Sequence, residues 1–546
     1  MTLMVLLALV AQIDLPGTSS VSVAFSPASV CAECHATFDP QGSPHDTWMG
    51  SAMAHAARDP WFRAAVVVAE RDHPGIGDLC FRCHTPEAWL EGRCLPSDGS
   101  RLLPTDTGIG CSGCHRMDPN PYVRNAQYVV VDEARVRGPY SVTPAPHATQ
   151  ASTWVSDSAF CGTCHDLVNP LVPRKSQDGT VTAMPFPEQT TYSEWLASDF
   201  VSEGRTCQAC HMPEEPGQNA LAGPQRRERS VHAFAGGNLF LLDSVALLFP
   251  ELDIQNQLQN GSLRIRQMMA SAAHLELIDP PASARKGELL ALTLRVVNDS
   301  GHKLPTGYPQ GRRVFLSARS QALGFDRGSY DPLTDELVDP LAVYEVVHGR
   351  HGVGPTHHLA LNDLVISDSR IPPRGFVATA TTAPVGKEFL ELQGGKLAHY
   401  DDVELAVEVP CDATEDIDLE FGLHYQSIHT AVVDELLDDT VGTPEAETLG
   451  LAFATFEQEP LPIASLRIRI PLDPLACALP DAGVPPRPDA GHSDASSADA
   501  GEALLEDQGC GCRSTSRSTS KSQPTEVAWV LLLALRLRKR AFRIGR

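Results

Sequence analysis

The stretch Cys31-Ala32-Glu33-Cys34-His35 decides how this chain is organised, because its pattern, C-x-x-C-H, occurs five times. The other copies are Cys80-Phe81-Arg82-Cys83-His84, Cys111-Ser112-Gly113-Cys114-His115, Cys161-Gly162-Thr163-Cys164-His165 and Cys207-Gln208-Ala209-Cys210-His211. C-x-x-C-H is the attachment pattern of c-type haem, in which two thiols add to the two vinyl groups of one porphyrin and the adjoining His binds the iron. The sequence therefore predicts five covalently attached haem c groups.

Each predicted attachment site gives a role to three residues. The thioether bonds would come from ten cysteines, Cys31, Cys34, Cys80, Cys83, Cys111, Cys114, Cys161, Cys164, Cys207 and Cys210. The proximal iron ligands would be the five motif histidines, His35, His84, His115, His165 and His211. The intervals between the motifs are unequal, so the chain is not a strict structural repeat. Five haems within residues 31–211 would have to supply much of the core and contact one another.

Zinc ribbons and disulfides are the alternative interpretations of paired cysteines. A zinc ribbon pairs two C-x-x-C motifs and does not need a His directly after each second Cys. A disulfide within C-x-x-C closes a very small loop and is usually a redox motif. Five copies that all end in His favour haem over both. Outside the motifs, Cys411 and Cys477 are candidates for a disulfide.

Length, charge and hydrophobic pattern predict several domains of different kinds. The chain has 546 residues and a net charge of -25, which argues against a nucleic-acid partner. Apolar residues alternate with polar ones over 290–296, 403–409, 417–423 and 466–470, as in antiparallel strands. We expect an α+β chain in which a haem-packed, mainly helical and irregular cytochrome domain precedes an antiparallel β-sandwich-like domain.

The composition changes along the chain and suggests where the segments begin and end. The predicted segments are a signal-like segment at 1–12, a pentahaem domain at 13–235, a helical connection at 236–273, a β-sandwich-like domain at 274–477, a disordered linker at 478–509 and a sorting or anchor-like tail at 510–546. The apolar start and the covalent haems both indicate export to the periplasm or the cell surface. The run Val527–Leu535 is too short to span a bilayer.

A haem iron with two imidazole ligands needs a second His from elsewhere in the chain. Seven histidines outside the motifs, up to residue 302, are available for this role. The favoured distal candidates are His55, His147, His232 and His302, and the weaker ones are His45, His73 and His274. Met117 and Met212 follow proximal histidines too closely to reach the opposite face of the same haem.

Several segments resemble exported multihaem cytochromes c, in particular the tetrahaem cytochrome and hydroxylamine oxidoreductase-related group. The resemblance extends over about residues 30–320 and lies in Trp48–Phe62, Cys80–Pro86, Cys111–Pro119, Cys161–Pro170, Thr191–Trp195, Cys207–Pro213 and the turn His302–Gly307. It implies stacked haem pairs with mostly bis-His ligands, and it implies the distal role for the four favoured histidines. The tail resembles the C-terminal sorting tails of myxobacterial surface proteins, which implies association with the outer membrane or cell surface.

Three functions remain open from the sequence. The first is an electron carrier that exchanges single electrons with redox partner proteins through a row of haems. The second is an oxidoreductase that acts on a small nitrogen or sulfur compound at one haem with an open distal position. All five motifs end in His, whereas some related nitrite reductases have Lys as the catalytic ligand, and no catalytic residue can be assigned. The third is a surface binding protein whose β-domain is the active part.

Overall fold

The computed structural model describes residues 13–19, 24–39, 42–130, 135–141, 145–331, 336–456, 459–475 and 477. The chain divides into a compact unit, Met1–Ala476, and a second unit, Cys477–Arg546. The signal-like segment, the linker and the tail predicted at 1–12, 478–509 and 510–546 lie outside the described residues. In the described part of the chain, no helix has the length and apolar character needed to cross a membrane.

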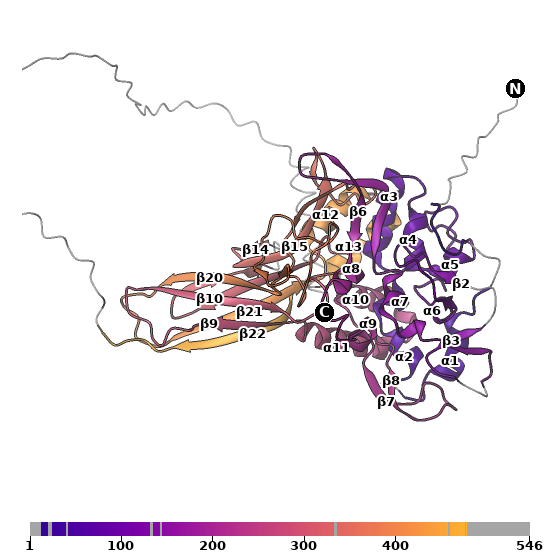
Figure 1. Ribbon diagram of the computed structural model, residues 1–546, viewed down its shortest axis with the longest axis horizontal. Helices are drawn as coiled ribbons and strands as arrows, with labels where there is room; N and C mark the ends of the chain where they lie inside the picture. The colour runs from indigo at the N-terminus through magenta and orange to yellow at the C-terminus, as the bar shows by residue number, and fades with distance from the viewer. Residues whose placement is uncertain are drawn as a thin grey trace, which may run out of the picture. The chain divides into compact units, whose positions relative to one another are not determined.

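The described residues between 13 and 235 form short helices joined by irregular segments and short strands (Figure 1). The helices are α1 (Ala28–His35), α2 (Pro44–Met49), η1 (Ala52–His55), α3 (Pro60–Asp72), α4 (Gly77–His84), α5 (Pro86–Leu90), α6 (Cys111–His115), η2 (Trp154–Ser156), α7 (Ser158–Gly162), α8 (Thr191–Leu196) and α9 (Cys207–His211). The strands are β1 (Met117–Asp118), β2 (Val129–Val130), β3 (Val136–Gly138), β4 (Thr149–Ala151), β5 (Leu167–Lys175), β6 (Val181–Gln189), β7 (Glu214–Gly217) and β8 (Arg226–Ser230). All of the strand pairs among them are antiparallel except β3 with β4.

The motifs form short helices, and this local structure places their Cys and His side chains on one face, where they could bind a flat ring. Helices α1, α4, α6 and α9 each end at the motif His. In a helix, residues three and four positions apart lie on one face, so both Cys and the His of C-x-x-C-H project to the same side. The fourth motif begins within α7 and continues as a turn after Gly162.

The hairpin β5–β6 was not predicted, because its strands contain prolines and show little alternation. Its Lys175 amide donates to the carbonyl of Asp363 at 2.6 Å, and Phe186 packs with Val346 and Val365. Val346 lies in β15 (Ala342–Arg350) and Val365 in β17 (Leu364–Asp368). The hairpin therefore joins the motif region to the strands that follow it.

The connection between the two regions is helical and is interrupted at Pro250, as predicted. It consists of α10 (Leu239–Leu248), η3 (Pro250–Leu252) and α11 (Gln255–Ala270). Helix α11 lies against the end of α2, where a Cβ atom on Gly261 would come within 1.8 Å of the Gly50 carbonyl oxygen. Only glycine permits this close approach of two backbones.

Two large antiparallel sheets follow, besides the two-stranded sheets β13–β14 and β18–β19, and the long strands of the large sheets run side by side (Figure 1). One sheet has the order β20-β10-β9, and the other has the order β16-β15-β11-β21-β22, with β12 and β17 paired at its side. The remaining bounds are β9 (Ala273–Ile278), β10 (Leu289–Asn298), β11 (Arg313–Ser320), β12 (Phe325–Arg327), β13 (Ser329–Asp331), β14 (Glu336–Val338), β16 (Gly354–Pro355), β18 (Glu391–Leu392), β19 (Lys396–Leu397), β20 (Tyr400–Glu408), β21 (Ile417–Gln426) and β22 (Leu461–Ile470).

Alternating burial in these strands builds one apolar core between the sheets. In β10, Leu290, Leu292 and Leu294 are buried while Leu289 and Ala291 are exposed. Leu419 and Phe421 of β21 belong to the same buried cluster. The four segments predicted as strands all form strands, and the expectation of a mixed α+β chain is confirmed.

Two helices within the predicted β-region, α12 (Thr430–Asp439) and α13 (Pro444–Thr455), were not predicted. Val433 and Leu436 of α12 and Leu449 of α13 pack in one cluster with Ala64 and Val68 of α3. These helices therefore cover α3, which belongs to the motif region. Cys411 and Cys477, the predicted disulfide candidates, are each disulfide-bonded.

Candidate haem-binding site

All five motifs open into one cavity of about 1960 Å³. Every one of the ten motif cysteines and five motif histidines lines it. Pockets for one small organic ligand occupy about 300–1,000 Å³, so this cavity exceeds what a single ligand of that size requires. The fold thus brings together residues that are spread over 31–211 in the sequence.

The cysteines in this cavity are not paired as the alternative interpretations require. All ten motif cysteines are free thiols, so no disulfide closes within a motif. In the part of the chain that the structure describes, the one convergent group of three or more His, Cys, Asp or Glu contains no motif residue. Neither a disulfide set nor a zinc ribbon accounts for the motifs.

Backbone carbonyls orient four of the five motif histidines through Nδ1. These contacts join His35 to Asn219 at 2.6 Å, His84 to Ala56 at 3.0 Å, His115 to Arg137 at 2.5 Å and His211 to Ala235 at 2.5 Å. Nδ1 of His165 lies 3.3 Å from Nε2 of Gln189. A carbonyl that accepts from Nδ1 leaves Nε2 with its lone pair, as a metal-binding imidazole needs.

Three motif histidines face a second imidazole across the cavity. The ring centroids are 6.5 Å apart for His35 and His147, 6.1 Å for His115 and His232, and 6.3 Å for His211 and His302. Three of the four favoured distal candidates are therefore brought opposite a motif His.

These separations fit an iron between the two rings. An imidazole nitrogen binds a metal ion at about 2 Å, and the ring centre lies roughly 1 Å further, so two imidazoles on opposite sides of one iron have centroids roughly 6 Å apart. Direct stacking would bring the rings closer together, as in the pair Phe62 and His84, whose centroids are 3.6 Å apart. The donor atoms and their spacing thus fit a haem with two axial imidazoles.

Burial favours the neutral form of several histidines that line the cavity, which favours metal binding. Burial lowers the pKa of His165 to about 4 and that of His232 to about 3. The pKa values of His115, His211 and His302 are lowered for the same reason. A neutral ring offers a lone pair to iron at physiological pH.

His84 and His165 differ from the other three, because no imidazole of the described residues is paired with either ring. His84 instead stacks on Phe62, with 2° between the ring planes. Phe62 lies on α3, whose Asp59 caps the helix by accepting from the amides of Trp61 and Phe62. The motifs at 80–84 and 161–165 would therefore hold haems with a different distal environment.

Polar groups without a hydrogen-bond partner gather near the second motif. Glu188 is buried, its Oε2 accepts no hydrogen bond, and burial raises its pKa to about 8. It interacts electrostatically with Cys80 and with Tyr308, whose ring lies 5.3 Å from that of Trp61. The indole nitrogen of Trp61 also has no partner. This side of the cavity contains a protonated carboxyl and hydrogen-bond donors.

The turn that carries His302 is held by a buried ionic network. Lys303 Nζ lies 2.6 Å from Asp368 Oδ2, and Arg370 lies 2.8 Å from the same oxygen and 3.0 Å from Glu194 Oε1. Burial raises the pKa of Asp368, but Arg370 and Lys303 outweigh burial and hold the pKa well below its usual range. Glu194 belongs to α8, so the network connects this turn to the motif region.

The other distal candidates are placed differently. His45 lines the cavity, while His55, His73 and His274 do not. The buried His55, a favoured candidate, bonds through Nε2 to the Met49 carbonyl at 2.9 Å. His73 is exposed, and His274 bonds to Asp299 at 2.6 Å.

Some residues of the site carry no signal in the sequence. Glu188 and Tyr308 lie in segments without a motif. The proximity of Glu188 to Cys80 and to Tyr308 depends on hairpin β5–β6 and on the turn after His302. A single polar residue in an irregular strand belongs to no recognisable sequence pattern, so the sequence does not indicate it as a site residue. The turn His302–Gly307 is the exception, because it is part of the resemblance.

Thiol contacts show which motifs are neighbours. The side chains of Cys31 and Cys111 share a hydrogen bond, as do Cys83 with Cys164 and Cys161 with Cys207. Cys114 interacts electrostatically with Cys161 and Cys164. The first motif is therefore next to the third, and the fourth is next to the second, third and fifth.

No protein-family model matches this chain, and no curated protein matches it. One solved structure with a similar chain is the penta-heme cytochrome c552 from Thermochromatium tepidum, at 17% sequence identity and a TM-score of 0.48. The match covers 82% of this chain and 99% of that chain. A likeness of this degree leaves the function to be argued from the residues of this chain.

Proposed function

We propose that this protein is an exported pentahaem c-type cytochrome that carries single electrons in a respiratory or extracellular electron-transfer chain. The observation that carries this proposal is the cavity in which five C-x-x-C-H motifs meet and three motif histidines face a second imidazole at roughly 6 Å. Haem c would supply the one-electron couple of its iron. The ten thiols would hold the porphyrins, and the motif imidazoles, with the imidazoles that face three of them, would bind the irons.

The contacts between motifs support a relay rather than isolated haems. Haems attached to cysteines that touch one another have edges in close proximity. The first and third motifs would lead to the fourth, which also contacts the second and fifth. Electrons would then pass through a branched group with the haem of Cys161 and Cys164 at its centre, and redox partner proteins would deliver and remove them.

The haem count and the ligand set test this proposal together. Mass spectrometry of the denatured protein should show five covalent haems, and electron paramagnetic resonance of the oxidised protein should show three low-spin bis-imidazole signals. A variant with Cys207→Ser and Cys210→Ser should lose one haem and the signal assigned to His211 and His302. Fewer than five haems in the unaltered protein, or no bis-imidazole signal, would contradict the proposal.

A second candidate function is an oxidoreductase for a small nitrogen or sulfur compound at one open haem. It is favoured by the absence, within the described residues, of an imidazole paired with His84 and by the buried acid near Cys80. The raised pKa of Glu188 would let it hold a proton for transfer to a bound substrate.

Carbon monoxide distinguishes the two functions. An open haem should bind it in the reduced protein, and Glu188→Gln should shift the stretching frequency of the bound carbon monoxide because a nearby proton donor changes. If all five reduced haems resist carbon monoxide and no high-spin ferric signal appears, the result supports the electron-carrier function and contradicts the oxidoreductase function. The exposed variant Glu404→Gln is the matched control.

Export and surface attachment are also proposed, on the sequence alone. The apolar start at 1–12 and the chemistry of covalent haem attachment support export. The tail at 510–546 would associate with the outer membrane or cell surface. Proteinase treatment of intact cells would distinguish a surface location, in which the protein is cleaved, from a periplasmic one.

A further inference from the structure

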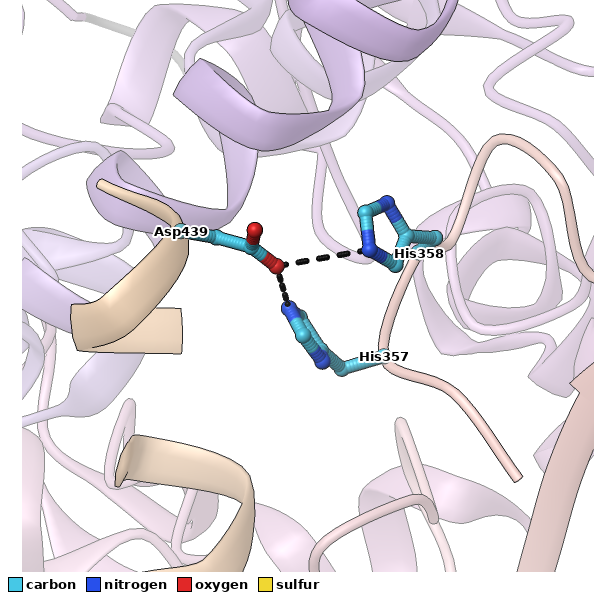
Figure 2. A group of neighbouring side chains, drawn as sticks. All are labelled: His357, His358 and Asp439. Carbon is cyan, nitrogen blue, oxygen red and sulfur yellow. Dashed lines mark ion pairs between the residues drawn. The ribbon is translucent and has the colours of Figure 1, made fainter. Parts of the chain in front are cut away.

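Two adjacent histidines and an aspartate converge outside the haem cavity (Figure 2). His357 and His358 lie in the loop between β16 and β17, and Asp439 is the last residue of α12. Nε2 of His357 is 2.8 Å from Asp439 Oδ2, and Nε2 of His358 is 3.3 Å from the same oxygen. The loop and helix therefore bring two imidazole nitrogens and one carboxylate to a single point.

Each imidazole is oriented by a second carboxylate on its other nitrogen. Nδ1 of His357 lies 2.8 Å from Glu435 Oε2, and Nδ1 of His358 lies 2.6 Å from Asp72 Oδ2. Glu435 is one helical turn before Asp439, and Asp72 is the last residue of α3. Carboxylates that accept from Nδ1 and leave Nε2 for the ion are the usual outer partners of metal-binding histidines.

The centre of the group has one buried polar atom without a hydrogen bond and an excess of negative charge. Nε2 of His357 is buried and makes no well-directed hydrogen bond, although Asp439 is near. Three carboxylates, Asp72, Glu435 and Asp439, surround the two rings, and Arg71 is the guanidinium paired with Asp439. If both imidazoles are neutral, a divalent cation would balance the excess negative charge of these carboxylates.

We propose that His357, His358 and Asp439 bind one divalent transition-metal ion, with zinc as the representative case. Two imidazoles and one carboxylate suit zinc or iron, whereas calcium and magnesium prefer oxygen ligands alone. His358 and Asp439 remain about 30% exposed, so an ion can enter and water can complete its coordination. The ion would join α3, α12 and the 357–358 loop.

This site stands apart from the proposed haem function, since no haem motif residue takes part. It is nevertheless close to the haem cavity in the chain, because Leu359 and Ala360 follow His358 directly and line that cavity. Without metal, the ion pairs among the same residues would only hold α3, α12 and the loop together. Zinc binding and thermal unfolding distinguish this structural role from a metal site.

Zinc binding to the haem-loaded, full-length protein without a polyhistidine tag tests the proposal. Cys510 and Cys512 are first replaced by Ser in every sample, because these two cysteines could bind zinc themselves. After treatment with a chelator, the protein is titrated with Zn²⁺ by calorimetry, and zinc is measured against haem iron. We expect one zinc per chain, and a loss of at least tenfold in affinity for His357→Ala and for His358→Ala.

The outer carboxylates provide a graded test. Glu435→Gln and Asp72→Asn should weaken zinc binding by about 10–100-fold, as expected for outer-shell partners. His274→Ala is the matched control, because His274 also contacts one carboxylate through each ring nitrogen but, among the described residues, belongs to no group of three converging ligands, so this variant should bind zinc as the parent does.

Thermal unfolding distinguishes a metal site from a group of ion pairs that has only a structural role. Zinc should raise the melting temperature of the parent and leave that of His357→Ala unchanged, since only the parent would bind the ion. The proposal is overturned if the parent binds no zinc, if both histidine variants bind it as well as the parent, or if the variants lower stability while zinc stabilises none of the proteins.

Discussion

The imidazole rings of His211 and His302 lie 6.3 Å apart with 21° between their planes, although one ends helix α9 and the other lies beyond the start of the β-region. The haem of the fifth motif would therefore be completed by a residue outside the motif region. The two regions form one compact unit, and this pair gives a reason why they pack together.

Replacing His302 should leave its haem attached and change its spin state. In His302→Ala, the thioethers of Cys207 and Cys210 would hold the porphyrin, but the iron would lose its second imidazole. Mass spectrometry should still count five haems, while one low-spin signal in electron paramagnetic resonance becomes high-spin. His274→Ala, on an exposed ring outside the cavity, should leave the spectrum unchanged. An unchanged spectrum in both variants would refute the ligand assignment.

His55 should prove to be structural rather than an iron ligand. Its ring is buried and bonds the Met49 carbonyl through Nε2, and burial lowers its pKa to about 4. We expect His55→Ala to lower the free energy of unfolding by about 1–3 kcal/mol and to keep all low-spin signals. His147→Ala should instead lose one low-spin signal. Loss of a low-spin signal in His55→Ala would show that this ring binds iron.

The ionic network under the His302 turn should contribute strongly to stability. Lys303→Met would leave the buried carboxylate of Asp368 without its 2.6 Å partner. Removal of one member of a buried ion pair costs about 3–5 kcal/mol, measurable by denaturant unfolding. Arg295→Met, which breaks the exposed pair with Asp402, should have a much smaller effect. Equal effects for the two variants would show that the network is not needed to hold the turn.

Glu188 should make stability decrease as pH rises. Its pKa is raised from 4.5 to about 8, so between these values the folded protein keeps a proton that the unfolded chain has lost. Folding then takes up a proton, and the free energy of unfolding falls between pH 4.5 and about 8. Relative to Glu188→Gln, the unaltered protein should become less stable over this range and change little above it. A constant difference between the two proteins from pH 5 to 9 would contradict a buried, protonated Glu188.

The order of Cys, Cys and His in the motifs was enough to predict the covalent attachment residues, because their chemistry depends on residues three and four positions apart. The same is true of α10, α11 and the alternating strands, whose burial follows a local period. The hairpin β5–β6 and helices α12 and α13 were missed because prolines or short length obscure that period.

Which histidines lie opposite the motif rings depends on tertiary packing. His55, one of the favoured candidates, lies in a short helix near a motif, yet it bonds the backbone at Met49, while His147, His232 and His302 face motif rings. The convergence of His357 and His358 on Asp439 likewise depends on α12 packing against α3. The sequence by itself determined where the five predicted attachment motifs lie, since each motif is a local pattern. The fold decided which side chain stands opposite each motif histidine, because that requires contacts between residues far apart in the chain.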